Sequence, residues 1–196
     1  MQSEVLAKKN NSIHPTALIN WEKIQIGNGN IIGPYVCIGL DPLTYSQESD
    51  GIIKIGDNNI IREFTTIQLP TKDSKITQVG NNNFLMSNTH ISHDCKIEND
   101  ITLAIGVVLN GQVNVMVGSY IGSGVVAHQY QTIGSYSIVG MNSTITKKSE
   151  IKPGGKYIGS PAKYIGINQV GLDRFNVSKE ELDNQSLRYR CLIHKY

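Results

Sequence analysis

The sequence predicts an all-β protein, a left-handed parallel β-helix followed by a short C-terminal α-helix. An aliphatic residue recurs at every sixth position from Ile55 to Ile151, and only Asp73 and Ala127 interrupt the repeat. A period of six matches neither the helical turn of about 3.6 residues nor the two-residue alternation of a flat strand. Glycine often follows the aliphatic residue, and small or polar residues fill the positions between, as tight corners require.

This period is typical of a chain that turns a corner after each short strand and points one aliphatic side chain inward per side. Three sides make a coil of about 18 residues, so residues 18 apart should stack at about 4.8 Å, the spacing of neighbouring strands. We expect the β-helix domain, which would carry any active site, to span residues 13–165. A short helical appendage should cover residues 166–196.

Two excursions should project from the coils. The first aliphatic run, which begins at Ile26, is out of phase with the later one, and this mismatch predicts a loop at residues 40–53. Ile67 and Val79 are twelve residues apart and keep the phase, so residues 68–78 should replace one side of a coil with a second loop. In solenoids, such loops commonly supply recognition.

The repeat stops after Ile151, and two turns rich in glycine and proline follow at residues 152–155 and 159–163. The run Ser178-Lys179-Glu180-Glu181 is typical of a capping box at the start of a helix. We expect that helix to pack on the last coil, or on a neighbouring subunit, through its apolar residues Leu182, Leu187, Cys191 and Leu192.

Composition excludes several classes of protein. The 18 Lys and Arg residues against 16 Asp and Glu give a net charge of +2, which does not indicate a basic surface for binding nucleic acid. The N-terminus has no apolar run long enough for a signal peptide, and no stretch approaches the roughly 20 apolar residues of a membrane span. The three cysteines lack the spacing of a metal site or a disulfide framework. These features favour a cytoplasmic protein without a bound metal.

The candidate site is a column of outward-facing residues on one coil edge. Two of the five histidines, His90 and His93, flank the inward-facing Ile91. The 18-residue register stacks Gly111 above His93 and places further polar residues beside them. The residues that fall on this edge are His93, Asp94, Gly111, Gln112, His128 and Gln129.

The residue types in this column suit acyl transfer. His93 can accept a proton from a hydroxyl or amine near neutral pH, and Asp94 can fix its tautomer and stabilise the imidazolium. Gly111 lets a substrate approach its backbone N–H, which can hold the oxyanion that develops when a thioester carbonyl is attacked. A lone histidine on a corner is more often only solvated, and the stacking of several such groups favours a site.

Several motifs within residues 13–175 resemble one known family. They are Ile13-His14-Pro15-Thr16-Ala17, Ile55-Gly56-Asp57-Asn58, Ile61-Arg62-Glu63, His90-Ile91-Ser92-His93-Asp94-Cys95 and Val126-Ala127-His128-Gln129-Tyr130. This part of the chain is similar to the UDP-N-acetylglucosamine O-acyltransferases of lipid A biosynthesis. The resemblance implies a homotrimer with active sites between subunits. It also implies transfer of an acyl group from acyl carrier protein to the sugar, with no cofactor required.

The same resemblance implies roles for individual residues. His93 would be the general base, Asp94 its partner and the Gly111 N–H the oxyanion donor. Met141 would floor the groove for the acyl chain and shorten it. The remaining substrate-binding residues would be His90, Gln112, His128, Gln129 and Arg174.

The chain departs from the family pattern at three places. The first excursion has Leu43-Thr44-Tyr45-Ser46 where the family usually has Gln-Asp-Leu-Lys. Gln112 replaces a histidine, and Arg174-Phe175 replaces two arginines, which weakens bidentate binding of the diphosphate. The acceptor therefore stays open among nucleotide-linked amino sugars, and so do the acyl length and whether the product is an ester or an amide.

Other functions remain alternatives. Gly159-Ser160-Pro161-Ala162-Lys163 looks like a turn common in hexapeptide acetyltransferases, so an acetyl-CoA-dependent sugar O- or N-acetyltransferase of surface polysaccharide synthesis is the runner-up. A zinc carbonic anhydrase of the same fold needs a histidine pair five residues apart, which the chain lacks. A binding or scaffold role without chemistry is the third alternative, and it would survive loss of His93.

Overall fold

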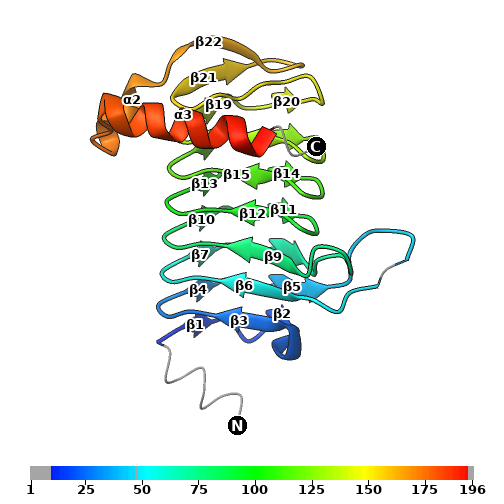
Figure 1. Cartoon of the computed structure of the whole chain (residues 1–196). Coiled ribbons are helices and arrows are strands. Elements are labelled where there is room, and N and C mark those ends of the chain that lie inside the picture. Colours follow the sequence, from blue (N-terminus) through cyan, green and yellow to red (C-terminus); the bar gives the residue numbers. More distant parts are fainter. Residues whose placement is uncertain (1–9, 47, 194–196) are drawn as a thin grey trace.

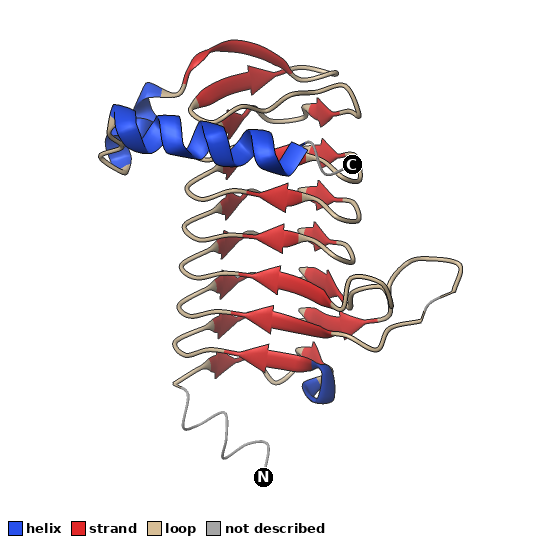
Figure 2. Ribbon diagram, viewed as in Figure 1, coloured by secondary structure: helices blue, strands red, loops and turns tan. Residues whose placement is uncertain are grey.

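The chain winds into a three-sided prism of stacked coils, described by a computed structural model for residues 10–46 and 48–193 (Figure 1). Each coil adds one short strand to each of three sheets, in which coil strands pair in parallel with the coils before and after them. The parallel β-helix expected from the six-residue period is confirmed. Figure 2 shows that strands form the body of the prism and that helices lie only at its surface and ends.

We number the sheets in the order in which the chain first visits them. Sheet 1 contains β1 (Ser12–Ile13), β4 (Ile31–Ile32), β7 (Ile60–Ile61), β10 (Phe84–Leu85), β13 (Thr102–Leu103), β16 (Tyr120–Ile121), β19 (Ile138–Val139), β21 (Gly155–Ile158) and β22 (Lys163–Ile167). Sheet 2 contains β2 (Leu18–Ile19), β5 (Cys37–Leu40), β8 (Thr66–Gln68), β11 (His90–Ile91), β14 (Val108–Leu109), β17 (Val126–Ala127) and β20 (Thr144–Ile145). Sheet 3 contains β3 (Ile24–Ile26), β6 (Ile52–Ile55), β9 (Ile76–Val79), β12 (Lys96–Ile97), β15 (Asn114–Val115) and β18 (Thr132–Ile133).

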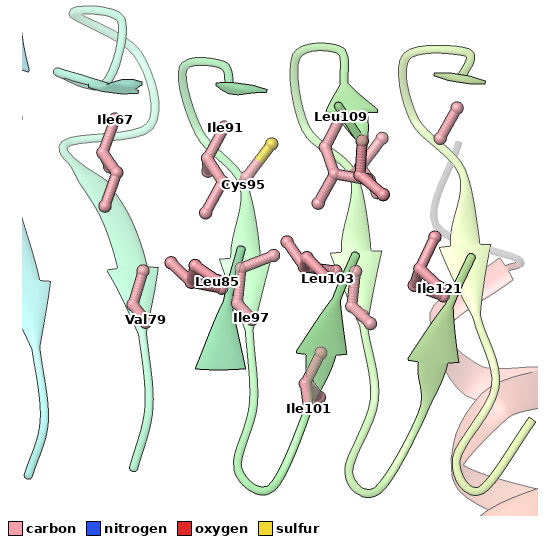
Figure 3. Close-up of a cluster of buried hydrophobic side chains, with 14 of the residues drawn as sticks. Ile67, Val79, Leu85, Ile91, Cys95, Ile97, Ile101, Leu103, Leu109 and Ile121 are labelled. Carbon is pink, nitrogen blue, oxygen red and sulfur yellow. The ribbon is translucent and has the colours of Figure 1, made fainter. Parts of the chain in front are cut away.

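The core is the ladder of inward aliphatic side chains, which line up from coil to coil in Figure 3. Ile67, Ile91 and Leu109 are fully buried in successive coils of sheet 2. Ala127 interrupts the aliphatic pattern but not the fold, because it lies in β17 with its small side chain also fully buried. Each large aliphatic side chain buried in this way contributes about 1.5–3 kcal/mol, and the ladder therefore supplies most of the stability of the coils.

Two excursions leave the prism, as expected, and both lie on the corner between sheets 2 and 3. They span residues 41–51 and 69–75, less than the predicted ranges of 40–53 and 68–78. The difference arises because β6 and β9 are four residues long and pair with each other over their whole length. The strand residue Ile53 is fully buried, so the end of the first predicted loop belongs to the core.

The two excursions are joined to each other. The backbone N–H of Ile52 donates to the carbonyl of Lys75 (3.0 Å), and the Lys75 ammonium pairs with the Asp50 carboxylate. A second ion pair joins Lys72 and Glu48. These contacts support both loops in one arrangement beside the coil edge.

A buried ladder of amides lines the corner between sheets 3 and 1. The Asn59 N–H donates to Asn30 Oδ1 (2.9 Å), and the Asn83 N–H donates to Asn59 Oδ1 (2.9 Å). The Asn59 Nδ2 also donates to the Gly80 carbonyl (2.9 Å). The side chains thus satisfy backbone groups that the corner would otherwise bury without partners.

The C-terminal end carries features that the repeat did not predict. β21 and β22 form an antiparallel pair on the last coil, and a short helix, α2 (Gln169–Arg174), follows. The predicted helix is present as α3 (Lys179–Ile193), and Ser178 Oγ accepts from the Glu181 N–H (3.1 Å) at its start. A 3-10 turn, η1 (Trp21–Lys23), lies near the other end of the prism.

α3 lies across the side of the prism (Figure 1), and polar contacts join it to the coils. Arg188 pairs with Glu98, and Gln185 accepts from Ser135 Oγ (2.8 Å). Of the predicted apolar residues, Leu182 lies against Gly154 of the last coil, whereas Leu187 is exposed in the single chain and Tyr189 is the buried residue of the helix. Cys191 is also exposed. The helix contacts β18 of sheet 3, and the hydrogen-bonding side chains add polar contacts that the apolar spacing did not predict.

Within the described ranges, no helix has the length and apolar character needed to cross a membrane.

Candidate active site

The candidate site lies on the corner between sheets 2 and 3, beside the first excursion. A cavity of about 350 Å³ opens there, and its lining residues are Leu43, His90, Ser92, His93, Asn110, Gly111, His128 and Gln129. The predicted 18-residue register is confirmed in these coils, since His90 pairs with Val108 and Val108 with Val126. Stacking of coils therefore brings five of the predicted site residues to one cavity.

His93 and Asp94 form a hydrogen-bonded pair at the base of this cavity. His93 Nδ1 lies 2.8 Å from Asp94 Oδ2, and their side chains are 15% and 1% exposed. Burial alone would raise the pKa of Asp94, but hydrogen bonds from His93 and Thr71 outweigh it and hold that pKa below its usual value. An ionised Asp94 keeps the proton of His93 on Nδ1 and leaves Nε2 free to accept another proton.

Gly111 lies directly against the His93 ring. A Cβ at this position would be 2.3 Å from His93 Cε1 and 2.6 Å from Nε2, so any side chain would displace the imidazole. Among the described residues, none accepts a hydrogen bond from the Gly111 N–H. A free donor therefore sits beside a free imidazole nitrogen, which is the arrangement needed to hold an oxyanion next to a general base.

His90 and His128 complete the polar lining. His90 Nδ1 is 2.7 Å from Thr66 Oγ1, and burial, with a smaller effect of nearby His93, lowers the pKa of His90. His90 is therefore neutral at neutral pH and suited to hydrogen bonding with a substrate. His128 is exposed, and its Nδ1 lies 2.9 Å from the Gln129 carbonyl.

Besides Asp94, which contacts His93 from outside the lining, three predicted site residues do not line this cavity in the single chain. Gln112 Nε2 turns toward the hydroxyl of Tyr130 (3.4 Å). Met141 is 68% exposed on a different edge, between sheets 1 and 2. Arg174 lies exposed in the last turn of α2. A single subunit brings together the proposed proton-transfer groups but not these three residues.

Sequence reasoning missed four residues at the site. Ser92 and Asn110 are 18 residues apart and lie on the same corner as His93, so the register contained the signal that places them there. Leu43 and Thr71 come from the excursions, where the register is lost. No sequence pattern could place those two.

Across the described part of the chain, no group of three or more histidine, cysteine or acidic side chains is arranged to hold a metal ion.

The chain thus combines a parallel β-helix with a His–Asp pair against a glycine at a coil corner, as expected from its resemblance to the hexapeptide-repeat transferases. Comparison with known proteins narrows this class. LpxA, a UDP-N-acetylglucosamine acyltransferase from Bacteroides fragilis, is 34% identical, with 92% of this chain and 70% of that one superimposed at a TM-score of 0.81. LpxA from Acinetobacter baumannii is 28% identical, with 92% and 81% covered at a TM-score of 0.68. The chain belongs to the UDP-N-acetylglucosamine acyltransferase family, and the predicted left-handed parallel β-helix is the fold it shares with these structures.

Sequence relatives agree with this assignment. The acyl-[acyl-carrier-protein]–UDP-N-acetylglucosamine O-acyltransferase of Synechocystis sp. is 32% identical over 169 residues, and that of Gloeothece citriformis is 33% identical over 170 residues. Each alignment covers 86% of this chain but 60% of the relative, so the chain spans about three fifths of their length. No family model matches the chain.

Proposed function

We propose that the protein is an acyltransferase that moves an acyl group from acyl carrier protein to a hydroxyl of a UDP-N-acetylglucosamine-type nucleotide sugar, as in lipid A biosynthesis. The observation that carries the proposal is the His93–Asp94 pair held against Gly111 in an open cavity. The relatives are named for this reaction.

In the proposed mechanism, His93 Nε2 removes the proton from the acceptor hydroxyl as its oxygen attacks the thioester carbonyl. The Gly111 N–H holds the oxyanion of the tetrahedral intermediate, and Asp94 stabilises the imidazolium. When the intermediate collapses, the carbon–sulfur bond breaks and the carrier thiolate takes the proton from His93. The products are an ester and a free carrier thiol, and no cofactor is consumed.

His90, His128 and Gln129 would bind the sugar around the attacking hydroxyl, since their side chains line the same cavity. A larger hollow of about 640 Å³ shares His128 and Gln129 with it and extends toward Tyr189 of α3. That hollow offers room for the nucleotide part of the acceptor.

We also propose a homotrimer. Exposed apolar side chains gather on sheets 1 and 2 and on the edge between them, whereas the outer face of sheet 3 carries Lys54 and Lys96. Contiguous exposed apolar surface of this kind marks an interface between subunits. The exposed apolar residues of these two faces and their shared edge are Leu18, Ile31, Tyr35, Ile60, Phe64, Ile105, Val126 and Met141.

A trimer packed through this edge would bring Met141 of one subunit toward the cavity of another, where it would limit the acyl chain. Gln112 and Arg174 would then also bind substrate at a site shared between subunits. Light scattering tests this, because a trimer has three times the 21.6 kDa mass of the chain. A monomer that transfers acyl groups at full rate would contradict the shared site.

A cytoplasmic location is part of the proposal. All three cysteines, Cys37, Cys95 and Cys191, are free thiols, as expected in a reducing compartment. Burial raises the pKa of Cys95 to about 12, so this thiol is not a competing nucleophile.

An acetyl-CoA-dependent sugar acetyltransferase is the second candidate. The turn at residues 159–163 borders a hollow of about 820 Å³ whose rim includes Lys148, Lys152 and Lys163, and such a basic rim suits the phosphates of coenzyme A. This candidate uses the same His93 chemistry with a different donor.

A comparison of donors separates the two. Purified protein would receive UDP-N-acetylglucosamine with either hydroxyacyl carrier proteins or acetyl-CoA, and products would be read by mass spectrometry beside a His93→Ala control. Transfer from the carrier protein that His93→Ala abolishes supports the proposal. Transfer only from acetyl-CoA would refute it in favour of the second candidate.

A further inference from the structure

Thr71, in the second excursion, holds both oxygens of the buried Asp94 carboxylate. Its backbone N–H donates to Oδ1 (2.9 Å), and its hydroxyl donates to Oδ2 (2.8 Å). Oδ2 is also the atom that lies 2.8 Å from His93 Nδ1. One residue outside the cavity therefore contacts the group that orients the proposed base.

Two contacts from one residue do more than satisfy the carboxylate. Because the Thr71 N–H holds Oδ1 and its hydroxyl holds Oδ2, the plane of the carboxylate is fixed independently of the imidazole; without the hydroxyl, Oδ2 would depend on His93 itself for its position. With Asp94 in this plane, Oδ2 faces His93 Nδ1, which keeps the proton there and leaves Nε2 free against Gly111. The remaining backbone contact, from the Asp94 N–H to Thr77 Oγ1 (2.9 Å), fixes the main chain but leaves the carboxylate free to rotate.

The excursion is built to keep Thr71 in place. The Thr71 carbonyl accepts from the Lys75 N–H (3.3 Å), and the Leu69 N–H donates to the Leu40 carbonyl (2.8 Å) at the root of the loop. Lys75 in turn joins the first excursion through Asp50. Thr71 is thus anchored by its own loop and by the neighbouring one.

We propose that Thr71 is a positioning residue that sets the tautomer of His93 through Asp94. The proposal rests on the proposed acyl transfer for its kinetic consequence, but not for its structural one. Thr71 does not line the cavity. Its loss should therefore slow the chemical step without weakening substrate binding.

The kinetic test compares three variants of the full-length protein. Thr71→Val keeps the shape and the backbone N–H but removes the hydroxyl, and it should lower kcat about 10-fold with KM unchanged, the size expected for one hydrogen bond to a charged group. Thr71→Ser should restore kcat. Asp73→Ala changes an exposed neighbour in the same loop and should behave as wild type.

A double-mutant comparison shows whether the effect passes through Asp94. In an Asp94→Ala background, Thr71→Val should cause no further loss of kcat. The same 10-fold loss in that background, or a wild-type kcat in Thr71→Val alone, would overturn the proposal.

Nitrogen NMR of histidine-labelled protein tests the structural step without any activity, and the five histidines keep the spectrum simple. Wild-type His93 should show the proton on Nδ1, and Thr71→Val should show a mixture of the two tautomers. An unchanged tautomer in Thr71→Val would refute the role of Thr71. If instead the wild type transfers no acyl group from any donor, the proposed function fails while this measurement still decides the role of Thr71.

Discussion

Replacing Gly111 by alanine should disable the site while leaving the fold intact. The new Cβ would lie 2.3 Å from His93 Cε1 and 2.6 Å from Nε2, well inside van der Waals contact. The backbone at Gly111 is outside the left-handed region, so alanine adds no backbone strain. The imidazole must therefore swing away, and it loses its 2.8 Å hydrogen bond to Asp94.

The size of this effect follows from the role of the displaced group. A correctly placed general base contributes about 10²–10⁴-fold to a rate, so kcat should fall within that range while the free energy of unfolding changes by less than about 1 kcal/mol. The Gly111 N–H remains in the variant, which isolates the displacement of His93 from the loss of an oxyanion donor. Product formation by mass spectrometry and a thermal melt measure the two quantities.

A His93→Ala background supplies the control for Gly111→Ala. If alanine at position 111 acts by moving the ring, it should cause little further loss when the ring is absent. A Gly111→Ala protein with kcat within about threefold of wild type would show that the packing of His93 on Gly111 does not matter for catalysis, and the reasoning would be wrong.

Three further predictions concern stability and specificity. Burial lowers the pKa of His90 from 6.5, so below pH 6.5 the unfolded chain binds more protons than the folded one and the stability of the fold decreases. The variant His90→Gln should therefore lose less Tm between pH 7.5 and 5.5 than the wild type, and an equal loss would contradict this. Met141→Gly should lengthen the preferred acyl donor, which acyl-chain profiling would reveal, and an unchanged profile would end the idea of a length-limiting methionine. Asn59→Ala removes three hydrogen bonds from the buried amide ladder and should cost about 3 kcal/mol, as measured by urea unfolding; a cost below about 1 kcal/mol would mean that water replaces the amide.

The period of six was sufficient to predict the coils and the stacking of polar residues on one coil edge, because the period sets both which side chains point inward and which corners lie above one another. Ile91 is buried and His93 lies against Gly111 for the same reason: 18 residues make one coil. The same arithmetic also separates Met141 from His93, since the two positions are 48 apart, which is not a multiple of 18. In the proposed trimer, a second subunit would bring them to one site.

The remaining features depend on interactions that a repeat does not encode. Thr71 reaches Asp94 from a loop whose path is set by contacts with the other excursion. Apolar spacing did not predict the polar contacts of α3, in which Arg188 and Gln185 meet polar groups of the coils. α2 and the β21–β22 pair lie beyond the last repeat, where no periodicity remains.

The docking of α3 has a consequence for how the protein opens. In a solenoid each coil contacts only its neighbours, so coils can fray one at a time from an end. Here Glu98 accepts from the Val117 N–H in the next coil and also pairs with Arg188, while Ser135, two coils above Glu98, bonds to Gln185. The helix therefore fastens several coils at once. Amide hydrogens between Glu98 and Ser135 should therefore exchange with solvent in one cooperative step. Their protection against exchange should be that of all the coils joined by α3, rather than that of a single coil.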